Sequence, residues 1–207
     1  ADISESFKIV VVIISMASMT VGNIMALRQV NVKRMLAFSG ISHAGFMLMT
    51  LLSLSSSAGS LLYYASAYAL SGIAAFSVII YVCKNRDNED IVNFHGLGKN
   101  NPLLAAILTA SLLSMAGIPI FAGFFAKLVL FSDVIEAGHI ALVIVAVVNS
   151  IISVGYYFKL ILAMYTKEPN EERKATPFVI YAVAVVAIVL NIALGLFPSV
   201  VLDLLAY

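Results

Sequence analysis

Two basic side chains lie inside long apolar stretches of the sequence, where a charge is costly. Lys127 follows Pro119 by eight residues, and His43 follows Arg34 by nine. Desolvation penalises the charged form of a buried lysine, which can then exchange a proton near neutral pH. Histidine can pass a proton from one ring nitrogen to the other. Isolated proton-exchanging groups near the middle of a membrane are typical of a proton path.

Both side chains also have a plainer interpretation, which the sequence leaves open. Asp133 follows Lys127 by only six residues, so the ammonium group can instead extend to the outer membrane interface. His43 can equally make a hydrogen bond between helices without any role in transport.

Three further residues are weaker candidates for the same path. Lys159 lies seven residues before Thr166 and is expected to extend to the membrane surface. Tyr156, like its neighbour Tyr157, is either a packing aromatic or a hydroxyl relay, and Lys33 is most simply a charge that sets the topology. The single cysteine, Cys83, excludes a disulfide framework and a multi-cysteine metal site. We therefore predict no metal and no cofactor in this chain.

The composition is that of a membrane protein. Of the 207 residues, 62% are apolar and 11% are charged, and the mean hydropathy is +1.04. A soluble domain has roughly 45–50% apolar and about 25% charged residues, so a water-soluble globule and a disordered chain are both excluded. The net charge of +1 gives no electrostatic support to a nucleic-acid partner.

The apolar residues are grouped into stretches long enough to cross a lipid bilayer. A hydrocarbon core of about 30 Å requires roughly 20 apolar residues in a helix, and six stretches meet that requirement. We predict an all-α, polytopic bundle of six transmembrane helices. The predicted spans are Phe7–Leu27, Met35–Leu54, Leu61–Cys83, Pro102–Ser132, His139–Tyr165 and Pro177–Phe197.

The fourth span, Pro102–Ser132, is too long for one straight crossing. As a single helix it would reach about 46 Å, against about 30 Å for the bilayer core. Pro119 removes a backbone donor and disfavours helical geometry at the residue before it. We expect an interruption around Gly117–Pro119, with Lys127 facing the bundle interior, because broken backbone at membrane depth must be buried in protein or line a wet cavity.

The basic residues favour one orientation in the membrane. Nine of the ten that can be assigned to loops or span edges fall in the first, third and fifth loops, and only Lys8 falls on the other side. The positive-inside rule then predicts that these three loops are cytoplasmic and that both termini lie on the outer face. The nine residues are Arg28, Lys33, Arg34, Lys84, Arg86, Lys99, Lys167, Arg173 and Lys174.

Three sequence motifs resemble those of the antiporter-like membrane subunits of respiratory complex I. The first is Asn31–Gly45 (NVKRMLAFSGISHAG), the second is Leu113–Lys127 (LSMAGIPIFAGFFAK), and the third is Gly155–Lys159 (GYYFK). The two long motifs are specific, and their separation also fits. The resemblance extends from about Gly22 to Tyr165, and the last predicted helix follows in the order of the family.

The resemblance implies a division of the chain and a role for its buried basic residues. Residues 1–165 would form a five-helix unit like the second of two inverted repeats in a fourteen-helix subunit, and residues 166–207 would hold a cytoplasmic loop and the final helix. Lys127 would be a central proton-transfer residue, and His43 would belong to a polar axis along the membrane. Since the first repeat is missing, we expect a fragment or part of a split subunit. Lysine in the broken helix, with Tyr68, favours one subunit type of the family over the others.

The implied function is that of a non-redox subunit of a proton-translocating NADH–quinone oxidoreductase in the bacterial inner membrane. Its partners would be other membrane subunits of complex I, with NADH, quinone, flavin and iron–sulfur clusters bound elsewhere in that complex. A subunit of a cation/proton antiporter or of a membrane-bound hydrogenase is the alternative within the superfamily. A structural scaffold, whose polar groups only hold helices together, is the alternative of another class.

Overall fold

The computed structural model of the protein describes residues 5–53, 58–169 and 177–205. Over these residues the chain is helical between short connections, and its only strand-like pairing is an isolated antiparallel bridge between Asn31 and Asp90. The predicted all-α fold is therefore confirmed. The helices are α1 (Glu5–Leu27), α2 (Val32–Leu48), η1 (Met49–Leu52), α3 (Ala58–Cys83), η2 (Ile91–Phe94), α4 (Leu97–Asn100), α5 (Pro102–Ala116), α6 (Ala122–Glu136), α7 (Ile140–Thr166), α8 (Phe178–Leu196) and α9 (Pro198–Leu205).

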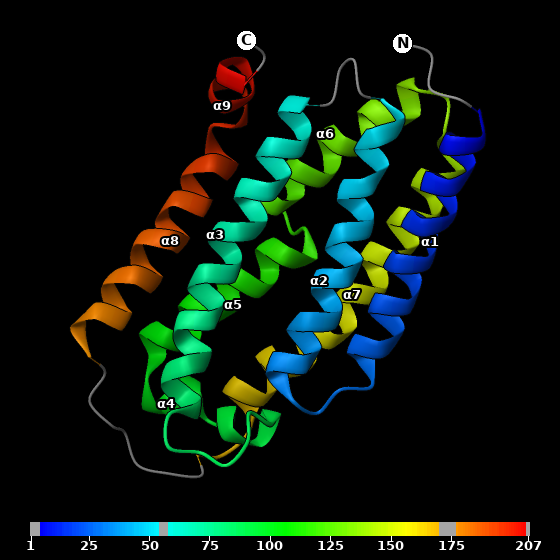
Figure 1. The fold of residues 1–207 in the computed structure, drawn as a ribbon. Coiled ribbons are helices and arrows are strands. Elements are labelled where there is room, and N and C mark those ends of the chain that lie inside the picture. The colour runs from blue at the N-terminus through cyan, green and yellow to red at the C-terminus, as the bar shows by residue number, and fades with distance from the viewer. Residues whose placement is uncertain (1–4, 54–57, 170–176, 206–207) are drawn as a thin grey trace.

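The long helices stand side by side in one bundle, with α8 at one edge and α1 at the opposite edge (Figure 1). α1 packs along α2 and α7, and α8 packs along α3. The connection between α1 and α2 lies at the same end as η2 and α4, while α9 and the start of α1 lie at the other end. The first and third loops therefore share one end of the bundle. Arg173 and Lys174, also predicted for that end, lie outside the described residues.

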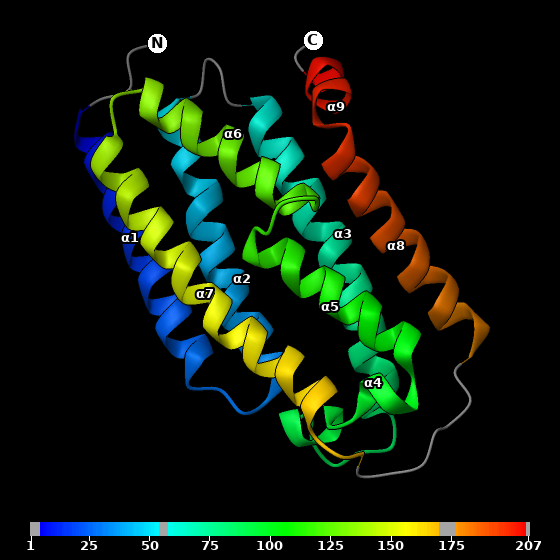
Figure 2. The same ribbon diagram turned by 180° about the vertical axis from the view of Figure 1, so that it is seen from behind.

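The predicted membrane spans agree with the helices of the bundle. Within the described residues, five helical stretches are long and apolar enough to cross a membrane: α1, α2 continued by η1, α3, α7 and α8. The remaining crossing consists of α5 and α6, which run end to end with a break between them (Figure 2). The fourth predicted span, Pro102–Ser132, is thus present as two half-length helices.

Some helix ends differ from the prediction. α2 begins at Val32 instead of Met35 because the side chain of Asn31 caps it, accepting a hydrogen bond from the backbone N–H of Arg34 at 3.0 Å. Beyond α8, Pro198 begins the further helix α9, which the sequence analysis did not predict. Proline is well suited to a first helical turn, where its missing N–H needs no partner.

The last long helix shares its core with the rest of the bundle. The amide nitrogen of Asn191 on α8 donates to the carbonyl oxygen of Ala67 and to the hydroxyl of Ser71, both at 3.0 Å. The hydroxyl of Tyr63 donates to the carbonyl oxygen of Leu194 at 2.7 Å. α8 is therefore joined to α3 by buried hydrogen bonds and not only by apolar contact.

Candidate functional site

The interruption between α5 and α6 is built by a helix end and a strained turn. Gly117 has φ +86°, a left-handed conformation that glycine adopts readily. The N–H groups of Gly117 and Ile118 both return to the carbonyl oxygen of Leu113, at 3.1 and 3.0 Å, and close the last turn. Ile120 has φ +90°, which is rare for a β-branched residue. The break between Ala116 and Ala122 thus includes the predicted Gly117–Pro119.

Lys127 lies in the interior of the bundle, as predicted, with only 6% of its surface exposed. Its ammonium group donates to the carbonyl oxygens of Met115 and Ala116, both at 3.1 Å. These carbonyls belong to the last turn of α5, where they lack helical partners and carry partial negative charge. The ammonium group also lies 5.2 Å from the centre of the Phe46 ring. The break in the helix therefore provides the ligands for the buried cation.

His43 is held by tyrosines from two neighbouring helices. Its Nδ1 lies 2.8 Å from the hydroxyl of Tyr64 on α3, and its Nε2 lies 3.2 Å from the hydroxyl of Tyr157 on α7. The ring of Tyr68 stacks on the imidazole with 4.4 Å between centroids. The hydroxyl of Tyr157 also bonds to that of Ser39. These are the hydrogen bonds between helices that a purely structural role for His43 requires.

A small cavity lies between Lys127 and His43, and Tyr64 forms part of its wall. The space open to the centre of a water molecule is about 10 Å³, which is about the minimum for one bound water. Neither basic side chain has the other among its hydrogen-bond partners. The two side chains thus line the same small buried cavity without a direct hydrogen bond between them.

Two serines extend this polar site towards α8. Ser71 on α3 and Ser114 on α5 line the cavity, and their hydroxyl oxygens lie 3.0 Å apart. Ser71 also accepts a hydrogen bond from Asn191. The backbone N–H of Gly123, in the first turn of α6, donates to the hydroxyl of Ser114 at 3.3 Å. Four helices therefore meet at this side of the cavity.

Tyr156 and Lys159 do not join Lys127. The hydroxyl of Tyr156 donates to the side-chain oxygen of Asn23 at 2.9 Å, in a buried cluster between α1 and α7. Lys159 is exposed and donates to the carbonyl oxygen of Gln29 at 3.2 Å, at the end of the bundle where α1 and α2 connect. Its ammonium thus lies at the surface, where the sequence analysis expected it.

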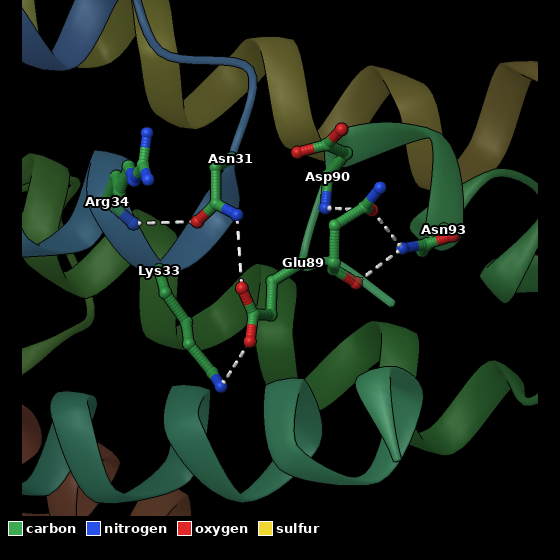
Figure 3. Close-up of polar contacts among 7 residues, drawn as sticks. Asn31, Lys33, Arg34, Glu89, Asp90 and Asn93 are labelled. Atoms are coloured by element: carbon green, nitrogen blue, oxygen red, sulfur yellow. Dashed lines mark hydrogen bonds and ion pairs between the residues drawn. The ribbon is translucent and has the colours of Figure 1, made fainter. Parts of the chain in front are cut away.

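Lys33 also lies at that end, about 15 Å along α2 from His43 at 1.5 Å per residue. Figure 3 shows Glu89 between Lys33 and Asn31: its carboxylate accepts from Lys33 at 2.7 Å and from Asn31 at 3.1 Å. The hydrogen bond from Lys33, followed by that from Asn31, holds the pKa of Glu89 below its ordinary value. The ion pair between Lys33 and Glu89 therefore joins the third loop to the start of α2.

Tyr64 is the site residue that the sequence analysis missed. Its signal was a polar stripe within an apolar stretch: Ser60, Tyr64, Tyr68 and Ser71 are spaced by four, four and three residues. Such spacing places side chains on one face of a helix. Tyr64 lies within the predicted span Leu61–Cys83, and its contact with His43 depends on the relative position of α2 and α3.

Known proteins share this fold and these motifs. A family model described as NADH:quinone oxidoreductase/Mrp antiporter, transmembrane, matches residues 2–153. The protein named NADH-quinone oxidoreductase subunit N of Flavobacterium johnsoniae is 78% identical over 204 residues, which cover 99% of this chain and 44% of the relative. The chain thus spans less than half the length of the curated relatives that it matches first.

Two solved structures are similar over nearly the whole chain. A chain in respiratory complex I from Thermus thermophilus with bound aureothin has a TM-score of 0.87 and 35% identity, over 95% of this chain and 45% of that one. A chain in the Mrp complex from Dietzia sp. has a TM-score of 0.86 and 25% identity, over 97% of this chain and 46% of that one.

Proposed function

Since this chain belongs to the NADH:quinone oxidoreductase/Mrp antiporter transmembrane family, we propose that it forms part of a proton-translocating subunit of a bacterial NADH–quinone oxidoreductase. The curated relatives named subunit N support this assignment. The lysine in the broken helix and Tyr68 favour the same subunit type. In the proposal the chain moves protons and carries no redox group of its own, and NADH, quinone, flavin and iron–sulfur clusters are bound by partner subunits.

One observation carries the proposal: a lysine buried at a broken helix faces a water-sized cavity that reaches His43. Burial disfavours the ammonium form, whereas the carbonyl end of α5 favours it. A change of about 1.4 kcal/mol in the local electrostatic energy then changes the ratio of charged to neutral Lys127 tenfold. Charge movement in a neighbouring subunit can therefore load and unload a proton at this amine.

The proposed orientation places the first, third and fifth loops in the cytoplasm and both ends of this segment on the outer face. The distribution of lysine and arginine supports it. Proton transfer between Lys127 and His43 would take place within the bundle, and the apolar sides of the helices would face lipid or partner membrane subunits.

The proposal is tested in the complete subunit, assembled in its complex, in inside-out membrane vesicles. Lys127→Ala is expected to abolish or strongly reduce NADH-driven proton uptake, measured with a fluorescent pH indicator, while assembly is retained. Lys127→Arg should also fail, because guanidinium hardly deprotonates. His43→Ala should cause a smaller loss, because water can replace a missing relay group.

Lys8→Ala is the matched control, because it removes a partly exposed lysine that pairs with Glu5 near the start of α1. This variant should pump protons at the normal rate. Normal pumping by Lys127→Arg in an assembled complex would show that proton release from Lys127 is not part of the mechanism.

A cation/proton antiporter is the second candidate, favoured by the likeness to the Mrp complex. The two functions differ in the partners of the chain and in the energy source. Purification of the intact complex decides between them: proton uptake that requires NADH supports the first proposal, and uptake driven by a cation gradient without NADH supports the second.

A further inference from the structure

We infer that Tyr64, His43 and Tyr157 form a single proton relay across α3, α2 and α7, in which both tyrosine hydroxyls take part. This inference rests on the proposed function and names the groups that continue the path beyond Lys127. Its basis is that each ring nitrogen of His43 is bonded to a tyrosine hydroxyl from a different helix.

The protonation state of a neutral imidazole links the two hydroxyls. One of its nitrogens donates and the other accepts. One tyrosine must therefore donate to His43 while the other accepts from it, and a change of tautomer requires both hydroxyls to change roles. Tyr68 stacks on the imidazole at 4.4 Å and hinders ring rotation, so each nitrogen keeps its own tyrosine.

The relay is connected at both ends. Tyr64 and Lys127 line the same cavity, and in this relay a water molecule held there passes a proton from the ammonium group to the hydroxyl of Tyr64. At the other end, the hydroxyl of Tyr157 bonds to Ser39 on α2. His43, Tyr157 and Ser39 are each at most 4% exposed, so proton exchange with bulk water does not bypass the relay.

One proton passes along the relay without changing the net charge of its groups. Lys127 gives a proton to the cavity water, the water gives one to the oxygen of Tyr64, and Tyr64 gives its own hydroxyl proton to Nδ1 of His43. Nε2 releases its proton to the oxygen of Tyr157, which passes its former proton to Ser39, and Ser39 releases one to water. Each group of the relay gains one proton and loses one, so no charge remains on the relay. His43 is left in its other tautomer.

A packing role alone does not require this arrangement. A buried tyrosine hydroxyl needs one partner, and a backbone carbonyl suffices, as Leu194 does for Tyr63. Tyr156, next to Tyr157, bonds to Asn23, an amide that does not exchange protons readily. Among these four tyrosines, only Tyr64 and Tyr157 direct their hydroxyls to an imidazole, whose two nitrogens can accept and release protons.

The test compares Tyr64→Phe, Tyr157→Phe and the double variant in the assembled complex in vesicles. Each substitution removes one hydroxyl and keeps the ring. Each single variant should lower NADH-driven proton uptake about tenfold, below the usual 10²–10⁴ for a proton-transfer group because water replaces part of the relay. The double variant should lose no more than either single one, since a serial path is already interrupted. Independent packing effects would instead add.

Tyr181→Phe is the control, because it removes a 2.7 Å hydrogen bond to Asn101, the residue just before α5, without touching His43. It should pump normally. A second readout is the ¹⁵N spectrum of His43 in the labelled complex, where Tyr157→Phe should shift the Nε2 signal far more than Nδ1, and Tyr64→Phe the reverse.

The outcomes separate the relay from the proposed function. If Lys127→Ala abolishes pumping while Tyr157→Phe pumps like Tyr181→Phe, the relay is wrong and the proposed function stands. Additive losses in the double variant would also overturn the relay. If Lys127→Ala itself pumps normally, the proposed function is wrong.

Discussion

Gly117 is the residue on which the position of the Lys127 side chain depends most directly. Its φ of +86° is unfavourable for other residues, and an added Cβ would lie 3.1 Å from Cδ of Lys127. We therefore predict that Gly117→Ala destabilises the protein by about 1–2 kcal/mol through backbone strain and also displaces the ammonium group. Proton uptake by the assembled complex should fall severalfold.

Gly138→Ala separates these two effects. Gly138 has φ +87°, but no atom lies within 4 Å of the position of its Cβ. The two variants should lower the temperature of half-inactivation to a similar extent, and only Gly117→Ala should impair pumping. Equal pumping by both would show that contact with Gly117 does not position Lys127.

The hydrogen bonds to Glu89 predict that the contact between the first and third loops depends on pH. Since hydrogen bonds from Lys33 and Asn31 lower its pKa, its stabilising contribution is complete above the ordinary pKa, about 4.3, and is lost as the pH falls through the lower folded-state value. The backbone N–H groups of Val32 and Ile91, which join the first and third loops, should then lose protection against hydrogen exchange, after correction for the intrinsic rate.

Glu89→Gln should abolish this pH dependence and leave protection low throughout. Glu168→Gln is the control, because it removes the carboxylate of an exposed pair with Lys99 while leaving Glu89 in place. If acidification weakens the two amides equally in Glu89→Gln and in the unmodified protein, another group is responsible.

The sequence indicated which residue types carry the site but not all of their contacts. Lys127 and His43 were identifiable because charged or titratable groups are rare in apolar spans. The two carbonyl ligands of Lys127 were not, because any residue has a carbonyl and only the position of the break frees those of Met115 and Ala116. The contacts of Tyr64 and Tyr157 with His43 depend on the packing of three helices.

At the scale of the helices, α8 is predicted to support the break between α5 and α6. A Cβ added to Gly195 would lie 2.3 Å from the carbonyl oxygen of Ile120 and 2.7 Å from the backbone nitrogen of Ala122. Gly195→Ala must therefore move α8 or the break, at a cost of about 1–3 kcal/mol. We expect a lower temperature of half-inactivation together with reduced pumping.

Gly72→Ala on α3 is the matched control for this prediction. No atom lies within 4 Å of the Cβ position at Gly72, and alanine is favoured over glycine in a helix by about 0.5–1 kcal/mol. This variant should be as stable as the unmodified protein or more so. A Gly195→Ala protein that is equally stable and active would contradict the supporting role of α8.

The long helices were predictable because length and hydropathy define them, whereas the short ones depend on contacts between distant segments. Phe94 in η2 is fully buried, and the N–H of Gly96 donates to the carbonyl oxygen of Ala163 on α7 at 3.4 Å. Neither contact produces a periodic pattern of apolar residues in the loop sequence. α2 begins before the predicted residue because Asn31 caps it. That cap is identified by the hydrogen bond from the backbone N–H of Arg34 to the side chain of Asn31.

At the scale of the whole molecule, the proposed orientation can be tested by cysteine labelling in a Cys83→Ser background. Ala137, between α6 and α7, and Asp87, in the third loop, are both exposed. The connection from α6 to α7 and the loop that follows α3 lie at opposite ends of the bundle (Figure 1). A membrane-impermeant maleimide applied from outside should label Ala137→Cys in intact cells and should label Asp87→Cys only after the membrane is opened. Ser57, also in an outer loop by this proposal, lies outside the described residues. The reverse pattern would invert the orientation without changing the helix assignment.

The two bonds of Lys127 to the end of α5 have a stereochemical consequence. A protonated amine has three N–H groups in tetrahedral directions, and two are directed at the carbonyl oxygens of Met115 and Ala116. When the third proton leaves, the neutral amine still has two N–H groups, so both carbonyls keep their donors and the lone pair occupies the vacated direction. The nitrogen can thus release and accept its proton along one fixed direction while the end of α5 stays capped.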